Sequence, residues 1–112
     1  MRYLYLDTET FSAVPITSGT HAYAEHAEIM ICTWALDDGP VRILDCTIES
    51  PSGGLFALLL DTDVTVVIHN SHFDRTIIRH VWGIDIPTSR IHDTMIQAMS
   101  QKAITAMVTG TR

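Results

Sequence analysis

Two carboxylates near the N-terminus of this 112-residue sequence, Asp7 and Glu9, have a spacing that suits a metal site. They belong to an apolar segment, residues 2–7, that is typical of a strand, and residues two apart on a strand share a face. Two carboxylates on one face repel each other unless a cation lies between them, and Mg²⁺ and Mn²⁺ prefer oxygen ligands. The pair favours a divalent metal site where the strand runs out, at the mouth of a sheet. A solvated strand end explains the pair equally well.

A third carboxylate, Asp74, lies in the segment Ser71–Trp82, which is predicted to be a helix that ends at Gly83. At about 100° per residue, Asp74 falls inside the apolar stripe of this helix. The neighbouring charged residues Arg75, Arg79 and His80 point away from the stripe. A carboxylate that faces a core is costly unless it is paired, protonated or close to a metal. We therefore group Asp74 with the candidate metal ligands.

The competing interpretations of these polar residues are structural. Asp74 could form a salt bridge or a cap under the sheet, with Arg2 or Arg42 as its partner. Asn70 is predicted to cap the helix that follows it, and Asp93 to cap the last helix. The six histidines show no spacing that is typical of a zinc site.

The elements that must position these residues follow an order that predicts an α/β fold with a mixed sheet. The first three strands are expected to form an antiparallel meander, and β-α-β units follow them. The predicted elements are strands 2–7, Ile29–Leu36 and Val41–Cys46, helix Ser52–Leu60, strand Val64–Ile68, helix Ser71–Trp82, strand Ser89–His92 and a helix from about Thr94 to Met107. No element is predicted for the long segment Phe11–Glu28, although long loops beside a site are often functional.

Composition limits the class of protein. With 46% hydrophobic and 18% charged residues, the chain is expected to form one globular domain. Its net charge of −6 argues against a broad basic surface for nucleic acid, but two bound divalent cations would offset much of that charge. We predict no membrane span and no signal peptide, because no apolar run is long enough. Two cysteines without metal-ligand spacing do not require an oxidising compartment, and we expect a cytoplasmic protein.

Two ordered motifs resemble those of the DEDD, or DnaQ-like, 3′→5′ exonucleases. Leu6-Asp7-Thr8-Glu9-Thr10 resembles their first motif, DxE, and His69-Asn70-Ser71-His72-Phe73-Asp74 is similar to the second, in which Asn is followed closely by Phe-Asp. The run from Tyr23 to Val41 and the stretch His92–Met95 are similar to the exonuclease domain of phage-type family A DNA polymerases. The resemblance covers essentially the whole chain and implies an RNase H-like mixed sheet.

The resemblance also implies a division of labour around two Mg²⁺ or Mn²⁺ ions. It places Asp7 between both metals, Glu9 on the metal that activates water, and Asp74 in support of the second. The implied substrate-binding residues are Thr8, Thr10, Asn70 and Phe73. The implied substrate is the 3′ end of single-stranded DNA, with RNA as the alternative.

The sequence departs from the family pattern after Asp93. The third motif requires a Tyr or His followed by a fourth Asp on a later helix, but no Asp or Glu follows Asp93. We therefore expect residues 1–112 to be a single, incomplete domain that lacks the C-terminal helices of the family and has weak or no nuclease activity. The alternatives are a catalytically dead nucleic-acid-binding or interaction module, and an unrelated α/β protein.

The missing helices predict self-association. The apolar strands Ile29–Leu36 and Val64–Ile68 need cover on both faces of the sheet. A large exposed apolar patch usually marks an interface, and a two-fold dimer is the commonest arrangement that closes one. We predict a homodimer; the alternative is that the final helix folds back and covers the patch.

Overall fold

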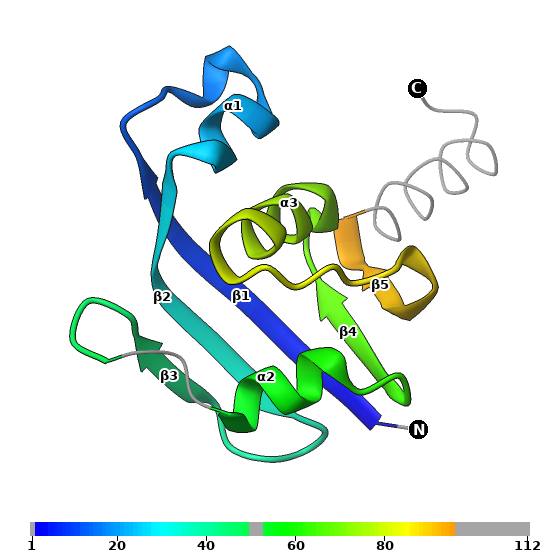
Figure 1. The fold of residues 1–112 in the computed structure, drawn as a ribbon. Helices are drawn as coiled ribbons and strands as arrows, with labels where there is room; N and C mark the ends of the chain where they lie inside the picture. The colour runs from blue at the N-terminus through cyan, green and yellow to red at the C-terminus, as the bar shows by residue number, and fades with distance from the viewer. Residues whose placement is uncertain (1, 50–52, 96–112) are drawn as a thin grey trace, which may run out of the picture.

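A five-stranded mixed sheet forms the centre of the computed structural model, which describes residues 2–49 and 53–95 (Figure 1). The strand order is β3-β2-β1-β4-β5. Strands β1, β2 and β3 pair in antiparallel fashion, whereas β4 is parallel to β1 and to β5. The elements are β1 Arg2–Ser12, η1 Ile16–Ser18, α1 Thr20–Glu25, β2 Ala27–Leu36, β3 Arg42–Asp45, α2 Gly53–Leu60, β4 Val64–Ile68, α3 Ser71–Trp82, η2 Thr88–Arg90 and β5 Ile91–Asp93. The predicted α/β class, the meander and the crossover units are confirmed.

The helices α1, α2 and α3 lie on the same side of the sheet (Figure 1). Alternation along β1 shows the consequence, because Leu4 and Leu6 are buried under the helices while Tyr3 and Tyr5 are exposed on the other face. The core on the covered face consists mainly of Leu4, Leu6, Ile29, Cys32, Leu44, Leu55, Leu59, Val64, Val66, Ile68, Ile77, Ile78, Ile84 and Ile86. We call the other side the open face, since no described helix packs on it.

Helix α3 has the bounds that periodicity predicts. Its residues Ile77 and Ile78 are completely buried, whereas Arg79 and His80 on its other side are exposed. The helix ends at Gly83, whose φ of 70° lies in the left-handed region and whose N–H donates to the Arg79 carbonyl at 3.1 Å. Glycine adopts this conformation without steric cost, which explains the stop.

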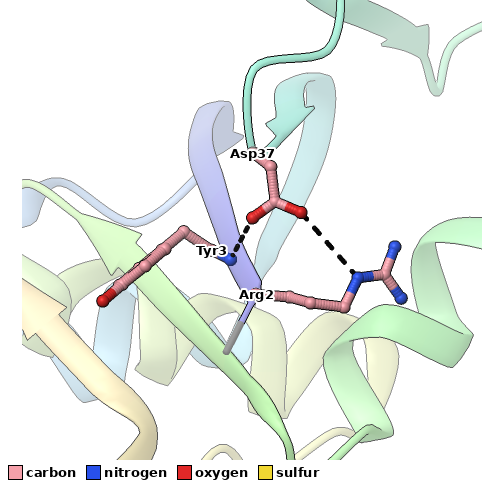
Figure 2. A network of polar contacts seen from close by, with 3 residues as sticks. All are labelled: Arg2, Tyr3 and Asp37. Atoms are coloured by element: carbon pink, nitrogen blue, oxygen red, sulfur yellow. Dashed lines mark hydrogen bonds and ion pairs between the residues drawn. The ribbon is translucent and has the colours of Figure 1, made fainter.

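The turn between β2 and β3 is fastened to the start of β1 (Figure 2). Asp37 has a φ of 49°, and its Oδ1 accepts a hydrogen bond from the Tyr3 N–H at 2.7 Å. Its own N–H donates to the Tyr3 carbonyl at 2.8 Å, and its Oδ2 lies 3.9 Å from Nε of Arg2. The turn therefore completes the β1–β2 ladder as well as reversing the chain.

Some predicted bounds are wrong. Strand β1 does not end at residue 7 but continues to Ser12, because β2 pairs with it over this whole length. The segment Phe11–Glu28 is not structureless, since it includes the end of β1, η1, α1 and the start of β2. Of the predicted final helix, only Thr94 and Met95 lie within the described residues, and both are helical. Within the described ranges, no helix combines the length and apolar character that a membrane crossing requires.

The last strand begins later than predicted, at Ile91 and not at Ser89, because a short 3₁₀ turn continues to Arg90. The side chain of Arg90 is buried in the core. Its guanidinium donates to the carbonyls of Val64 at 2.9 Å, Leu59 at 2.6 Å and Leu58 at 3.2 Å. This buried cation joins α2, the start of β4 and β5.

Candidate active site

The candidate site lies where β4 stops and β1 continues. Strand β4 pairs with β1 only from Arg2 to Tyr5, whereas β1 runs on to Ser12. Asp7 and Glu9 belong to this extension, at the carboxyl end of the parallel pair, where α/β sheets commonly bind ligands. The expectation that the pair sits at the end of its own strand is therefore wrong; the strand that ends beside it is β4.

Asp7 and Glu9 both project from the open face. Each is exposed, and they alternate with Leu6 and Thr8, which point toward the helices. The pairing of β1 with β2 is regular from Leu4 to Glu9 and shifts only between Glu9 and Thr10, so the two carboxylates keep their common face. Asp7 borders a pocket of about 290 Å³ on this face, lined chiefly by Tyr5, Leu6, Asp7, Thr33, Trp34, Ala35, Val41 and Val67.

Asp74 lies on the covered side of the sheet, as the helical periodicity predicts, and only 4% of it is exposed. The Thr8 hydroxyl donates a hydrogen bond of 2.5 Å to its Oδ1. Burial raises the pKa of Asp74 to about 6; the Thr8 hydrogen bond opposes this, and the negative charges of Asp7 and Asp93 add to it. Asp7 and Asp93 are thus close enough to influence Asp74, although Asp7 and Asp74 start from opposite faces.

The structural explanation of Asp74 as the partner of Arg2 or Arg42 is not supported. Arg2 lies beside Asp37 (Figure 2), and the Arg42 guanidinium lies over the Trp34 ring at 5.6 Å. In the described part of the chain, the side chain of Asp74 accepts a hydrogen bond from the neutral hydroxyl of Thr8, so no cation there compensates its charge.

The start of α3 is capped from β5. Asn70 precedes the helix but does not cap it with its side chain, contrary to prediction, because its φ of 59° and ψ of 61° are left-handed and not the extended values of an N-cap. Instead, Asp93 accepts from the backbone N–H of Ser71 at 2.6 Å and of Asn70 at 3.2 Å. It also accepts from the Met95 N–H at 2.9 Å, which agrees with its predicted role at the following helix.

Helix α1 contributes a residue that sequence reasoning did not single out. The Tyr23 hydroxyl lies 2.9 Å from the Thr10 hydroxyl, and the Tyr23 and Phe73 rings have centroids 5.7 Å apart. The Ser12 hydroxyl donates to the Tyr23 carbonyl at 2.9 Å. The sequence signals for this residue are an aromatic side chain in a long segment without clear period and its place at the start of the run that is similar to the phage-type exonuclease domain.

The predicted site residues thus form two groups around β1. Thr8, Thr10, Phe73 and Asp74 gather with Tyr23 on the covered side, whereas Asp7 and Glu9 lie on the open face. Asn70 lies at the turn into α3. Among residues 2–49 and 53–95, no three His, Cys, Asp or Glu side chains are arranged to hold a metal ion. The donor chemistry of Asp7 and Glu9 suits a hard divalent cation, and Asp74 lies on the covered side of the sheet, where it is bonded to Thr8.

Comparisons with known proteins identify the family of the chain. The sequence profile of a family described as 3′-5′ exonuclease matches residues 1–105. A DNA polymerase of Bacillus phage SP02 is 34% identical in an alignment of 102 residues, which covers 88% of this chain and 16% of the polymerase.

Two solved structures of Brucella melitensis NrnC, one of them bound to pGG, share the fold. Their TM-scores are 0.68 and 0.69 at 20% and 19% identity, and they cover 90% and 91% of this chain. The chain spans 44–45% of the NrnC chains, less than half of their length. Because the family profile covers nearly the whole sequence, the chain belongs to the 3′-5′ exonuclease family.

Proposed function

We propose that this chain carries the metal-binding part of a 3′→5′ exonuclease that hydrolyses phosphodiesters at the 3′ end of single-stranded DNA, with RNA as the alternative substrate. The observation that carries the proposal is the placement of Asp7 and Glu9 on one face of β1, just past the end of β4, with Asp74 nearby at the start of α3. The proofreading role and a location in a bacterial or phage-infected cytoplasm are part of the proposal.

Asp7 and Glu9 would hold the divalent cations, Mg²⁺ or Mn²⁺, and Asp74 would support the second ion. Such cations supply a nucleophilic water and stabilise the leaving oxygen. Asp74 accepts the Thr8 hydrogen bond at Oδ1, and a carboxylate has further lone pairs on both oxygens for a metal. A bound cation would favour the ionised form of Asp74 and thereby offset the effect of burial on its pKa.

The substrate contacts would come from the residues around the end of β1. Thr8, Thr10 and Phe73 lie together on the covered side, and Asn70 lies at the turn into α3. Tyr23 joins this group by its hydrogen bond to Thr10 and its contact with Phe73. The structure of NrnC bound to pGG supports a nucleic-acid ligand for this fold.

A second candidate function is that of a binding module without catalysis. Residues 94–112 contain no Asp, Glu, His or Tyr, so this segment holds neither the fourth carboxylate nor the general base of the family pattern. The two candidates share the same carboxylate pair and differ in turnover.

A nuclease assay distinguishes the two functions. With a 5′-labelled single strand and Mn²⁺, we expect barely detectable or no shortening from the 3′ end, because general acid–base assistance alone is worth about 10²–10⁴-fold in rate. Any such shortening should disappear in Asp7→Asn and persist in Asp38→Asn, which changes an exposed turn residue. Robust turnover that is lost in Asp74→Ala would contradict the expected weakness.

A further inference from the structure

A second pocket, lined by polar residues, lies between α1 and α3 in the helical layer, away from the candidate metal ligands. Its volume is about 200 Å³, and it is lined by His21, His72, Arg75, Thr76, Arg79 and Asp85. Liquid water occupies about 30 Å³ per molecule, so the pocket can hold a tetrahedral anion with some of its hydration.

The lining residues that α3 supplies come from one side of the helix. Residues 72, 75, 76 and 79 follow the spacing of a single helix face, and about 100° per residue places that face roughly opposite Asp74. His21 belongs to α1, and the centroid of its ring lies 6.0 Å from that of His72 and 6.4 Å from that of His80. The pocket is therefore formed by two helices and by Asp85 in the segment after α3, and none of the candidate metal ligands lines it.

The guanidinium groups at this pocket differ from the other arginines in the described part of the chain. Arg2 is beside Asp37, Arg42 lies over Trp34, and Arg90 binds backbone carbonyls in the core. Those three have structural partners.

Arg75, by contrast, engages only its Nε among the described residues, through a hydrogen bond to the Ile86 carbonyl at 2.9 Å. Arg79 is exposed, and its side chain makes no hydrogen bond or ion pair with residues 2–49 or 53–95. With Asp85 as the acidic lining residue, the two arginines leave the pocket with a formal charge of +1 while its histidines are neutral.

We propose that this pocket binds a phosphate group of a single nucleic acid strand, an inference that rests on the proposed function. Arginine presents a planar fork of donors that matches phosphate oxygens, and histidine adds ring N–H donors. Contacts to phosphates position a strand without reading its sequence. In a chain with net charge −6, such a local cationic pocket supplies attraction that the overall charge does not.

The position of the pocket determines which phosphate it takes. It lies across α3 from Asp74, and a helix with its side chains is about 10–12 Å wide. Because Asp7 and Glu9 lie on the open face, a strand with its 3′ end at them must pass the end of β4 and then α3 to reach Arg79. The pocket accordingly holds an internal phosphate and not the scissile one.

Fluorescence anisotropy of a labelled oligothymidylate in EDTA tests this inference without turnover. Arg79→Gln should weaken binding roughly 5- to 10-fold at low salt, because a hydrogen bond to a charged group is worth more than a neutral one. The slope of log affinity against log salt should fall by about 0.7, the value for one lost contact to a single strand. Arg42→Gln is the matched control, since it removes the same charge from an exposed arginine outside the pocket.

The outcomes separate the inference from the proposed function. Equal effects of Arg79→Gln and Arg42→Gln, or no effect of either, would overturn the pocket while leaving the exonuclease proposal in place. The absence of any oligonucleotide binding by the wild-type chain at low salt would overturn both. A titration with inorganic phosphate tests the other source of this ligand. If Arg79→Gln weakens the binding of inorganic phosphate but leaves the binding of oligothymidylate unchanged, the pocket is a free-phosphate site and the strand assignment is contradicted. Arg79 is exposed, and an unchanged circular dichroism spectrum of Arg79→Gln confirms that the fold is retained.

Discussion

Asp74→Asn is expected to stabilise the metal-free chain by roughly 2–3 kcal/mol at pH 7. Burial raises the pKa of Asp74 from 3.8 to about 6, so the ionised carboxylate is disfavoured in the folded state, at about 1.4 kcal/mol per pKa unit. Asparagine has nearly the same shape, carries no charge and still accepts the hydrogen bond from Thr8. Urea unfolding in EDTA measures the difference.

The sign of the pH dependence follows from the raised pKa. Between about pH 4 and pH 6 the folded state binds more protons at Asp74 than the unfolded state, so this residue contributes stability that increases as the pH falls. The advantage of Asp74→Asn over wild type should therefore be largest at pH 7 and nearly absent at pH 4. Asp38→Asn, on the exposed turn, should stay within about 0.5 kcal/mol of wild type. Destabilisation by Asp74→Asn at pH 7 would contradict this account of the site.

Self-association is the second large effect that we expect. Tyr3, Tyr5, Val41 and Ile43 are 40%, 47%, 71% and 69% exposed, and β1, β2 and β4 border an apolar pocket on the open face. Patches of this kind usually mark an interface, and a two-fold dimer buries the same patch on both copies. Light scattering at micromolar concentration should give twice the 12.5 kDa mass of one chain.

A charge on the open face should prevent this dimer. Ile43→Lys places a cation on β3, whereas the control Leu60→Lys changes a residue of similar exposure at the end of α2, in the helical layer. The first variant should be monomeric and the second should behave as wild type. A wild-type monomer that binds no dye for apolar surface would mean that the open face is covered within the chain.

Local patterns were sufficient to predict most of the fold. The 3.6-residue period placed Asp74 on the buried side of α3, and the alternation of β1 placed Asp7 and Glu9 on a common face. The turn at Asp37 and the stop at Gly83 also follow from residues that favour left-handed backbone conformations. These features depend on neighbours in the sequence, which is why the sequence alone indicates them.

The features that could not be predicted depend on distant contacts. Strand β1 extends to Ser12 because β2 pairs with it, and its apolar content alone gives no sign of that length. Asp93 caps a helix that begins 22 residues before it. The bond between Thr8 and Asp74 joins residues 66 positions apart in the sequence and lies on the covered side of the sheet. Two motifs in the correct order therefore indicated the family without giving the arrangement of their side chains.

Isothermal titration of Mn²⁺ tests the central claim most directly, because it measures metal binding without requiring catalysis. The wild-type chain should bind Mn²⁺, Asp7→Ala should abolish binding, and Asp38→Ala, which removes an exposed carboxylate on the β2–β3 turn, should leave it unchanged. Such a result would assign the cation to the carboxylates of β1. Equal binding by the wild type and Asp7→Ala would show that these carboxylates do not form a metal site, and would contradict the proposed function.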